Sequence, residues 1–277
     1  KCHPIDCDQY DLFLLHTNAS HQDKFQGIFD HILTFKLFMD ETIISHKIHH
    51  PLVPDSIYYV PDFISQVEES ALIENVLKSS KFKWKHLNNR SLQIYGGYPK
   101  PEGMIVEPLP EWLQFYTLKL KSLNVFEENL ANQVLINRYE PGQGIMAHED
   151  GPLYYPTVAT INTGSHTVLN FYKKIDPNSN DCSPKYEFSL LLWPRSLSIL
   201  QNTVYNQYLH EIEELKFDKI NFDPESNDQA SKKIVNLNLI EQIDSETQCL
   251  TRSTRYSFTI RFVPKFHKIN LNKFLFK

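Results

Sequence analysis

From Gln133 onward, short runs rich in β-branched and aromatic residues alternate with turn residues, and this alternation limits the possible fold most strongly. Short runs between turns are typical of strands, whereas helices need longer stretches with a period of 3.6 residues. The expected strands are 133–139, 144–148, 158–163, 167–173, 186–192, 197–201, 204–210 and 255–263. Eight strands at this spacing favour a double-sheet jelly roll, also called a double-stranded β-helix or cupin-like fold.

The segment before these strands adds helices to the expected fold. Ser65 and Glu68 form a capping-box pattern that begins a helix ending near Lys78. Pro110 begins a second helix, because proline is favoured in the first helical turn. The predicted class is therefore mainly β with flanking helices (α+β), built around a jelly roll.

Two regions depart from the regular pattern. Residues 1–54 hold seven of the 12 histidines and little periodicity beyond a candidate helix at 24–40, so they form an N-terminal appendage of uncertain order. Residues 211–251 are acidic and Asn-rich, which predicts a loop insertion that is mostly mobile surface. The expected division is an appendage at 1–54, a helical part at 55–131, a jelly-roll core at 132–265 and a tail at 266–277.

Composition excludes several classes of protein. The net charge of −5 argues against a protein that coats nucleic acid over its whole surface, while leaving room for a local basic patch. No run of 18 apolar residues occurs, so we expect no membrane-spanning segment. The four cysteines match no common zinc pattern, so we expect an intracellular protein with reduced thiols. The absence of a signal peptide suggests the nucleus or cytoplasm, and we expect a monomer.

His148 and Asp150 are the first candidates for chemistry. Residues two apart in an extended segment point to the same face, so this pair can hold one metal ion from one side. The same pattern occurs in His21-Gln22-Asp23, and most such pairs are solvated surface residues. The pair at 148–150 is favoured because it follows a glycine-rich turn and a strand-like run.

A metal site needs a third ligand, and two histidines compete for that role. His166 follows a Gly-Ser turn, whereas His210 ends the apolar run at 204–210. A histidine in that position is commonly a hydrogen-bonded core residue, but His210 is also placed like a ligand from the opposite side of a barrel mouth. Two histidines and one carboxylate form the protein half of a non-haem Fe(II) site, with open positions for oxygen and a co-substrate.

The last expected strand alternates strictly between polar and apolar residues. Its polar face carries Arg255, Ser257, Thr259 and Arg261. Alternation alone equally fits a surface strand with its polar face in water. Arginine, however, grips a carboxylate with two hydrogen bonds, so this face is suited to line an anion pocket inside a barrel. Asn137 and Tyr139 share one face of another strand and can also bind a carboxylate, although an ordinary strand end explains them as well.

Together these residues resemble the AlkB-type Fe(II)/2-oxoglutarate dioxygenases over about residues 55–265. The matching residues follow in the family's order: Asn137-Arg138-Tyr139, Pro141-Gly142, His148-x-Asp150, His210 and Arg255-x5-Arg261. Within the family, the chain is most similar to the branch of the sixth AlkB homologue of eukaryotes. That similarity rests on Pro152-Leu153-Tyr154-Tyr155-Pro156-Thr157, Gly164-Ser165-His166-Thr167, Phe171-Tyr172 and the long gap between His210 and Arg255.

The resemblance implies the cofactors and the roles of the site residues. Iron would be bound by the catalytic residues His148, Asp150 and His210. The implied 2-oxoglutarate residues are Asn137, Tyr139, Arg255, Ser257 and Arg261. Of these, Arg255 would pair with the distal carboxylate, and Arg261 would lie nearer the metal. With O2, the co-substrate would leave as succinate and carbon dioxide while a substrate C–H bond is oxidised.

The resemblance also implies that the region before the core covers the site as a substrate lid. A cluster of basic and aromatic residues there includes Lys83, Trp84 and Lys85, which suits phosphates and a stacked base. Tyr154 and Tyr155 are further candidates for stacking. A solvated basic loop explains the same lysines equally well.

Three hypotheses for function follow. The first is oxidative demethylation of alkylated nucleobases in DNA or RNA, with a nucleic acid as partner. The second is a 2-oxoglutarate oxygenase that acts on protein or on a small molecule. The third is a jelly-roll binding module without turnover, against which the intact ligands and both arginines count.

Overall fold

The computed structural model describes residues 43–175, 182–220, 233–244 and 246–267. All of them belong to one folded unit that begins at Ile43. The candidate helix at 24–40 and the His21-Gln22-Asp23 motif lie outside the described residues. Within the described part, no helix is long and apolar enough to span a bilayer.

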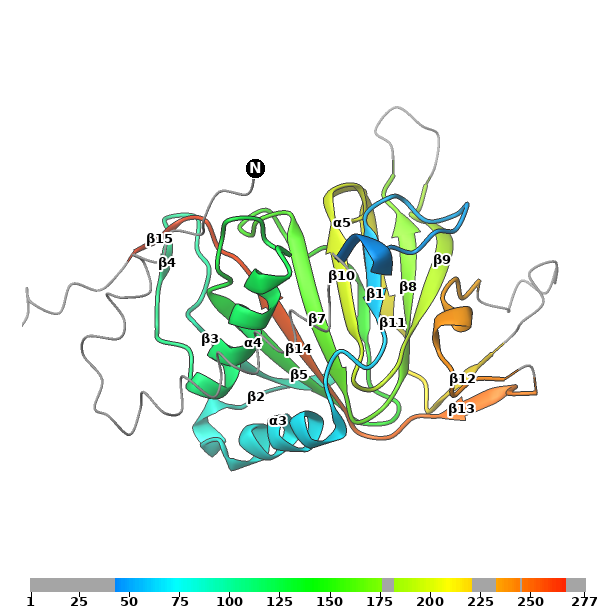
Figure 1. Cartoon of the computed structure of the whole chain (residues 1–277), viewed down its shortest axis with the longest axis horizontal. Coiled ribbons are helices and arrows are strands. Elements are labelled where there is room, and N and C mark those ends of the chain that lie inside the picture. The colour runs from blue at the N-terminus through cyan, green and yellow to red at the C-terminus, as the bar shows by residue number, and fades with distance from the viewer. Residues whose placement is uncertain (1–42, 176–181, 221–232, 245, 268–277) are drawn as a thin grey trace, which may run out of the picture. The chain divides into compact units, whose positions relative to one another are not determined.

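Two antiparallel sheets face each other and hold the core between them (Figure 1). The large sheet has the order β1-β10-β7-β14-β5-β3-β2 and the small sheet the order β6-β11-β8-β9. The large-sheet strands are β1 (Ile57–Val60), β2 (Lys85–Leu87), β3 (Arg90–Tyr95), β5 (Gln133–Tyr139), β7 (Thr157–Thr163), β10 (Leu197–Gln201) and β14 (Arg255–Arg261). The small-sheet strands are β6 (Ile145–His148), β8 (Thr167–Lys173), β9 (Lys185–Leu192) and β11 (Tyr208–Ile212). These sheets confirm the expected jelly roll.

The core between the sheets is apolar and aromatic. Phe171 of β8 and Phe188 of β9 are register partners whose rings stack at a centroid distance of 4.7 Å, and both are buried. On the other side of the large sheet, Phe258 of β14 meets Trp112 edge-on at 6.4 Å. Strand β14 therefore packs its apolar face on a helix and turns its polar face toward the small sheet.

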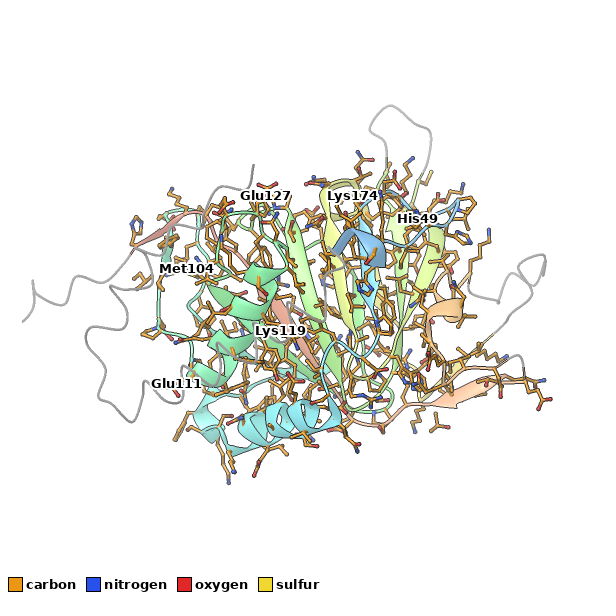
Figure 2. All side chains as sticks on the ribbon, in the orientation of Figure 1. His49, Met104, Glu111, Lys119, Glu127 and Lys174 are labelled. Carbon is orange, nitrogen blue, oxygen red and sulfur yellow. The ribbon has the colours of Figure 1, made fainter. Side chains whose placement is uncertain are left out.

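Two helices cover the outer side of the large sheet, α3 (Gln66–Lys78) and α4 (Glu111–Ser122) (Figure 1). The predicted capping box is confirmed, because Glu68 N donates to Ser65 Oγ and Ser65 N donates to Glu68 Oε2. Lys119 of α4 is buried and donates to the Phe63 carbonyl oxygen at 2.9 Å (Figure 2). This bond joins α4 to the segment that leads into α3.

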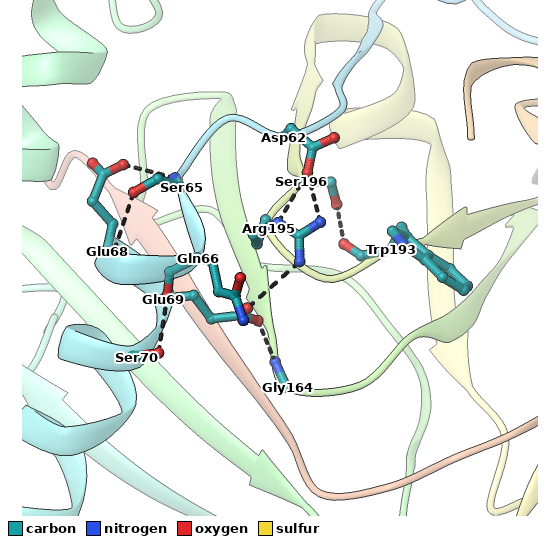
Figure 3. A network of polar contacts seen from close by, with 10 residues as sticks. All are labelled: Asp62, Ser65, Gln66, Glu68, Glu69, Ser70, Gly164, Trp193, Arg195 and Ser196. Atoms are coloured by element: carbon teal, nitrogen blue, oxygen red, sulfur yellow. Dashed lines mark hydrogen bonds and ion pairs between the residues drawn. The ribbon is translucent and has the colours of Figure 1, made fainter. Parts of the chain in front are cut away.

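A polar network fixes the start of α3 on two turns of the jelly roll (Figure 3). Gly164 N, in the turn between β7 and β8, donates to Glu69 Oε1 at 2.8 Å. Arg195, in the turn between β9 and β10, donates to Asp62 at 2.9 Å and lies 3.8 Å from Glu69. Gly164 has a φ of +81°, and a Cβ there would lie 2.5 Å from the Thr254 carbonyl oxygen, so the turn requires glycine.

The structure differs from the expected strand at 204–210. Asn202 adopts a φ of +47°, which breaks the strand after Gln201. A short helix, α5 (Asn202–Gln207), follows, and β11 begins only at Tyr208. His210 therefore lies in the middle of a strand and does not end one.

The appendage, the insertion and the tail are also more ordered at their edges than expected. Ile48 and Val53 pack into the core, and η1 (Ile43–His46) precedes them, so the folded unit begins before residue 55. In the insertion, β12 (Phe217–Lys219) pairs with β13 (Cys249–Thr251), and η3 (Leu237–Leu239) lies between them in sequence. The acidic stretch 223–228 lies outside the described residues. Further short elements are η2 (Lys81–Lys83), β4 (Met104–Ile105) and β15 (Phe266–His267), which pairs with β4.

A buried ion pair explains why part of the insertion is not a loop. Asp218 of β12 is 1% exposed and accepts two hydrogen bonds from Arg252, each 2.7 Å long. His166 Nε2 lies 3.3 Å from the same carboxylate. Burial alone would raise the pKa of Asp218, but the Arg252 guanidinium outweighs it and lowers the pKa to about 2. The pair thus attaches the insertion just before Arg255.

Asp218→Asn should lower the free energy of unfolding by about 3–5 kcal/mol at pH 7, because it leaves Arg252 buried without its partner. A depressed folded-state pKa gives stability that is present above the unfolded pKa of 3.8 and lost as pH falls toward 2. The difference between variant and wild type should therefore shrink from pH 4 to pH 2 in chemical denaturation. Asp55→Asn, at an exposed carboxylate, is the control. A difference that stays constant over this range would contradict the assignment.

Candidate active site

A cavity of about 250 Å³ lies between the two sheets. Nine of the residues predicted from the sequence line it: Asn137, Tyr139, His148, Asp150, Tyr154, His210, Arg255, Ser257 and Arg261. The volume is below the roughly 300–1,000 Å³ of sites for drug-sized ligands. The cavity therefore suits a small molecule together with one projecting group of a larger substrate.

The two candidate metal-binding histidines lie side by side on neighbouring strands of the small sheet. His148 at the end of β6 is the register partner of His210 in β11, and the ring centroids lie 4.3 Å apart. Burial lowers the pKa of His210 to about 4, so its ring is neutral at pH 7 and keeps a lone pair for a metal. His148 Nδ1 lies 2.9 Å from the Met146 carbonyl oxygen, a contact that leaves Nε2 as the nitrogen free to bind.

Asp150 completes the candidate donor set. Its side chain is buried, with Oδ2 3.8 Å from His210 Nε2 and Oδ1 hydrogen-bonded by Arg261 Nη2. Burial alone would raise the pKa of Asp150, but Arg261 and the two histidines outweigh it and hold the pKa below its usual range. In the described residues, no three His, Cys, Asp or Glu side chains are arranged as a formed metal site. His148, Asp150 and His210 nevertheless lie close together, and they are the donor types of a non-haem iron centre.

Arg255 lies on the β14 face that the alternation predicted to carry the anion pocket. It is 4% exposed, and its Nη2 donates to Asn162 Oδ1 at 2.6 Å. Its guanidinium lies 5.5 Å from the Tyr139 ring centre, and Nε has no hydrogen-bond partner among the described residues. Burial lowers the pKa of Arg255 to about 10, which is still charged at pH 7. No carboxylate pairs with it in the described ranges, so an anion in the cavity would meet a buried, uncompensated cation.

Strand register brings the remaining anion-binding candidates to Arg255. On β5, Asn137 is paired with Ser257 of β14, and Tyr139 is paired with Arg255 itself. Asn137 and Ser257 are both buried, at 6% and 4% exposure. The pairing therefore gathers an amide, a phenol and a hydroxyl around one guanidinium.

Two functional candidates were missed by the sequence analysis. Asn162 of β7 is fully buried and holds Arg255, and alternation through Val158 and Thr160, which line the cavity, would have placed it on that face. Arg90, a further basic residue close in sequence to Lys83 and Lys85, also lines the cavity. No sequence signal distinguishes it, because its position depends on the pairing of β3 with β5.

The loop that carries Asp150 is held from three sides. Lys174, which follows β8 and lies at the same end of the sheets as α5 (Figure 2), pairs with Glu149 and donates to the Asn206 carbonyl oxygen at 2.7 Å. Tyr205 of α5 donates to the Gly151 carbonyl oxygen at 2.8 Å. The Arg261 guanidinium lies 4.7 Å from the centre of the Tyr154 ring. The helix that replaced an expected strand thus supports this loop.

The other predicted substrate residues lie outside the cavity. Lys83 in η2 and Lys85 in β2 are exposed, and Lys83 Nζ lies 4.8 Å from the centre of the Tyr95 ring. Trp84 stacks on His86 at 6.4 Å. Tyr155 packs near Phe262 at 6.4 Å instead of lining the cavity. The basic residues therefore form a surface at the β2–β3 edge of the large sheet, separate from the interior.

The chain is similar in sequence to known proteins. No protein-family model matches the chain. It is 45% identical over 222 residues to a Danio rerio protein named "Probable RNA/DNA demethylase ALKBH6", which covers 79% of this chain and 90% of that protein. It is 28% identical over 239 residues to a Xenopus tropicalis protein named "tRNA (carboxymethyluridine(34)-5-O)-methyltransferase alkbh8", which covers 83% of this chain and 35% of that protein.

Solved structures resemble the chain more distantly. OsALKBH1 superposes with a TM-score of 0.49 and 11% identity, covering 76% of this chain and 99% of that one. A Pseudomonas putida prolyl-4-hydroxylase superposes with a TM-score of 0.42 and 11% identity, covering 76% and 93%. At these scores the likeness does not bear on the site.

Arg261→Met should lower the free energy of unfolding by about 3–5 kcal/mol, because Asp150 is then buried without its cation. Arg255→Met should cost clearly less, since it removes a buried charge that has no carboxylate partner among the described residues. Chemical denaturation of the full chain with a chelator present measures both changes. Equal losses in the two variants would contradict the distinction between a paired and an unpaired arginine.

Proposed function

The chain belongs to the AlkB family of Fe(II)/2-oxoglutarate-dependent dioxygenases, and we propose that it removes alkyl groups oxidatively from nucleobases of RNA or DNA. Family membership follows from 45% identity to a relative of which the chain covers 90%. The observation that carries the proposal is the unpaired Arg255 in a cavity that also holds two histidines and an aspartate. The name of the Danio rerio relative supports a nucleic-acid substrate.

In this proposal, His148, Asp150 and His210 hold the iron. Two imidazoles and one carboxylate are the donors that non-haem Fe(II) takes. The pKa of His210 is lowered by burial and that of Asp150 is lowered by Arg261 and the histidines, so both groups suit metal binding. Arg261 fixes the Asp150 carboxylate through Oδ1 and leaves Oδ2 on the side of His210. Such a hydrogen bond to a ligand orients it and keeps it ionised.

The co-substrate residues act on the other end of the cavity. Arg255 would pair with the distal carboxylate of 2-oxoglutarate, and Asn137, Tyr139 and Ser257 would donate hydrogen bonds to it. When bound with O2, iron and 2-oxoglutarate supply an oxidant for a substrate C–H bond, and the keto acid leaves as succinate and carbon dioxide. The residues of this chain bind and orient these groups and exclude water.

We propose that the nucleic acid binds over the exposed basic edge. Lys83 and Lys85 suit backbone phosphates, and Trp84 suits stacking on a base. Tyr154 at the cavity and Tyr155 beside it would contact the target base. A duplex does not fit a cavity of about 250 Å³, so the alkylated base must be single-stranded or flipped to present its alkyl group.

His148→Ala should abolish succinate formation that depends on Fe(II) and 2-oxoglutarate, because it removes one of three ligands. His49→Ala, at an exposed histidine, is the control and should keep wild-type activity. The assay follows succinate from the full chain and the products from a panel of N-alkylated oligonucleotides by mass spectrometry. Equal succinate from the wild type and the His148→Ala variant would rule out the iron site. Wild-type succinate formation that no oligonucleotide increases would instead favour a protein or small-molecule substrate.

Replacing both Lys83 and Lys85 by Gln should weaken binding of single-stranded oligonucleotides by a similar factor for every sequence. The slope of log K against log salt concentration should fall by about 0.7 for each phosphate that the variant no longer neutralises. Affinity for 2-oxoglutarate should not change, because neither lysine lines the cavity. Lys185→Gln with Lys219→Gln removes two exposed lysines elsewhere and serves as the matched control. An equal loss of affinity in both double variants would mean that only net charge matters.

A further inference from the structure

Arg90 connects the exposed basic edge with the interior of the cavity. It is the first residue of β3, which follows the exposed β2 and pairs with β5. Its register partner Leu87 on β2 is exposed, but Arg90 itself is half-buried and lines the cavity. Its Nε donates to Asn137 Oδ1 at 3.2 Å. One arginine thus lies on the strand next to the exposed β2 and also contacts the proposed co-substrate site.

This contact determines which way the Asn137 amide faces. Arginine carries only hydrogen-bond donors, so the Asn137 atom that meets Arg90 must be the oxygen. The two amide hydrogens of Asn137 then face away from Arg90, and Nδ2 has no hydrogen-bond partner among the described residues. Asn137 is paired with Ser257 and shares its strand face with Tyr139, the register partner of Arg255. The free amide hydrogens therefore belong to the group of donors around the unpaired guanidinium.

Arg90 also has no acidic partner of its own in the described ranges. Its only other side-chain bond there is a long one, 3.5 Å, from Nη1 to Asn89 Oδ1. By contrast, Arg138, the next residue along β5 from Asn137, is paired with Glu140. The cavity is thus lined by two arginines without a carboxylate, Arg255 and Arg90, and by one that Asp150 neutralises.

We infer that Arg90 is a positioning residue for the dicarboxylate co-substrate, which it acts on by orienting the Asn137 amide as a donor. The inference rests on the proposed function. Without Arg90, no hydrogen bond among the described residues holds the Asn137 oxygen, so the amide is no longer preorganised as a donor and part of the binding free energy is spent on orienting it.

The test measures binding of 2-oxoglutarate by isothermal titration of the full chain loaded with Mn(II), without turnover. Arg90→Met should weaken binding about tenfold, which corresponds to ~1.4 kcal/mol. Asn137→Ala should weaken it similarly, and the double variant should bind no more weakly than Asn137→Ala alone, because Arg90 acts through Asn137. Arg90→Gln restores a donor without the charge and should bind better than the Met variant. Arg138 follows Asn137 and is paired with Glu140, so Arg138→Met is the matched control and should bind 2-oxoglutarate like the wild type.

The outcomes separate this inference from the proposed function. If the wild type does not bind 2-oxoglutarate with Mn(II), the proposed function fails. If the wild type binds but Arg90→Met binds equally well, Arg90 does not position the co-substrate. Effects of Arg90→Met and Asn137→Ala that multiply in the double variant, or a Gln variant as weak as the Met variant, would overturn the route through Asn137. If the Met variant does not fold, as judged by thermal unfolding, Arg90→Ala and its double with Asn137→Ala decide by the same criteria.

Discussion

Strand β14 carries Arg255 and Arg261 into the space between two sheets, and burial of these two cations is the constraint on which the site depends. Water would otherwise solvate each guanidinium, so each needs a partner inside the protein. Arg261 finds the carboxylate of Asp150, whereas Arg255 finds only the neutral amide of Asn162 among the described residues. Arg261 therefore holds the Asp150 side chain in place, whereas the charge of Arg255 remains available to pair with an anionic ligand.

The same strand organises the rest of the large sheet. Its apolar face packs against α4 through Phe258, its polar face points toward the small sheet, and its two edges pair with β5 and β7 in continuous register. That register sets Asn137 beside Ser257 and Tyr139 beside Arg255. The small sheet supplies His148 and His210 from the opposite side. The chemistry that we propose thus takes place in the interior, and we propose that the substrate is recognised at the exposed β2–β3 edge.

Period-two alternation predicted the parts of the site that lie on long strands. It placed Asn137 and Tyr139 on one face of β5, and it placed the polar residues of β14 on one face of that strand. Both faces line the cavity. It could not predict α5, because the break at Asn202 depends on a positive φ that the apolar pattern does not signal. Nor could it predict that a buried pair of Asp218 and Arg252 orders part of the insertion, or that Arg90 enters the cavity. These features depend on contacts between residues far apart in sequence, which local patterns do not encode.

The central claim is that the cavity binds a keto acid with iron at one end and a second carboxylate at Arg255. An anaerobic titration of the Fe(II)-loaded full chain tests it directly, using visible charge-transfer absorption to compare 2-oxoglutarate with 2-oxopentanoate. The second acid has a methyl group in place of the distal carboxylate, so Arg255 stays unpaired when it binds. An unpaired buried charge costs about 2 kcal/mol or more, which predicts at least roughly thirtyfold tighter binding of 2-oxoglutarate. Equal affinity for the two acids would contradict the account.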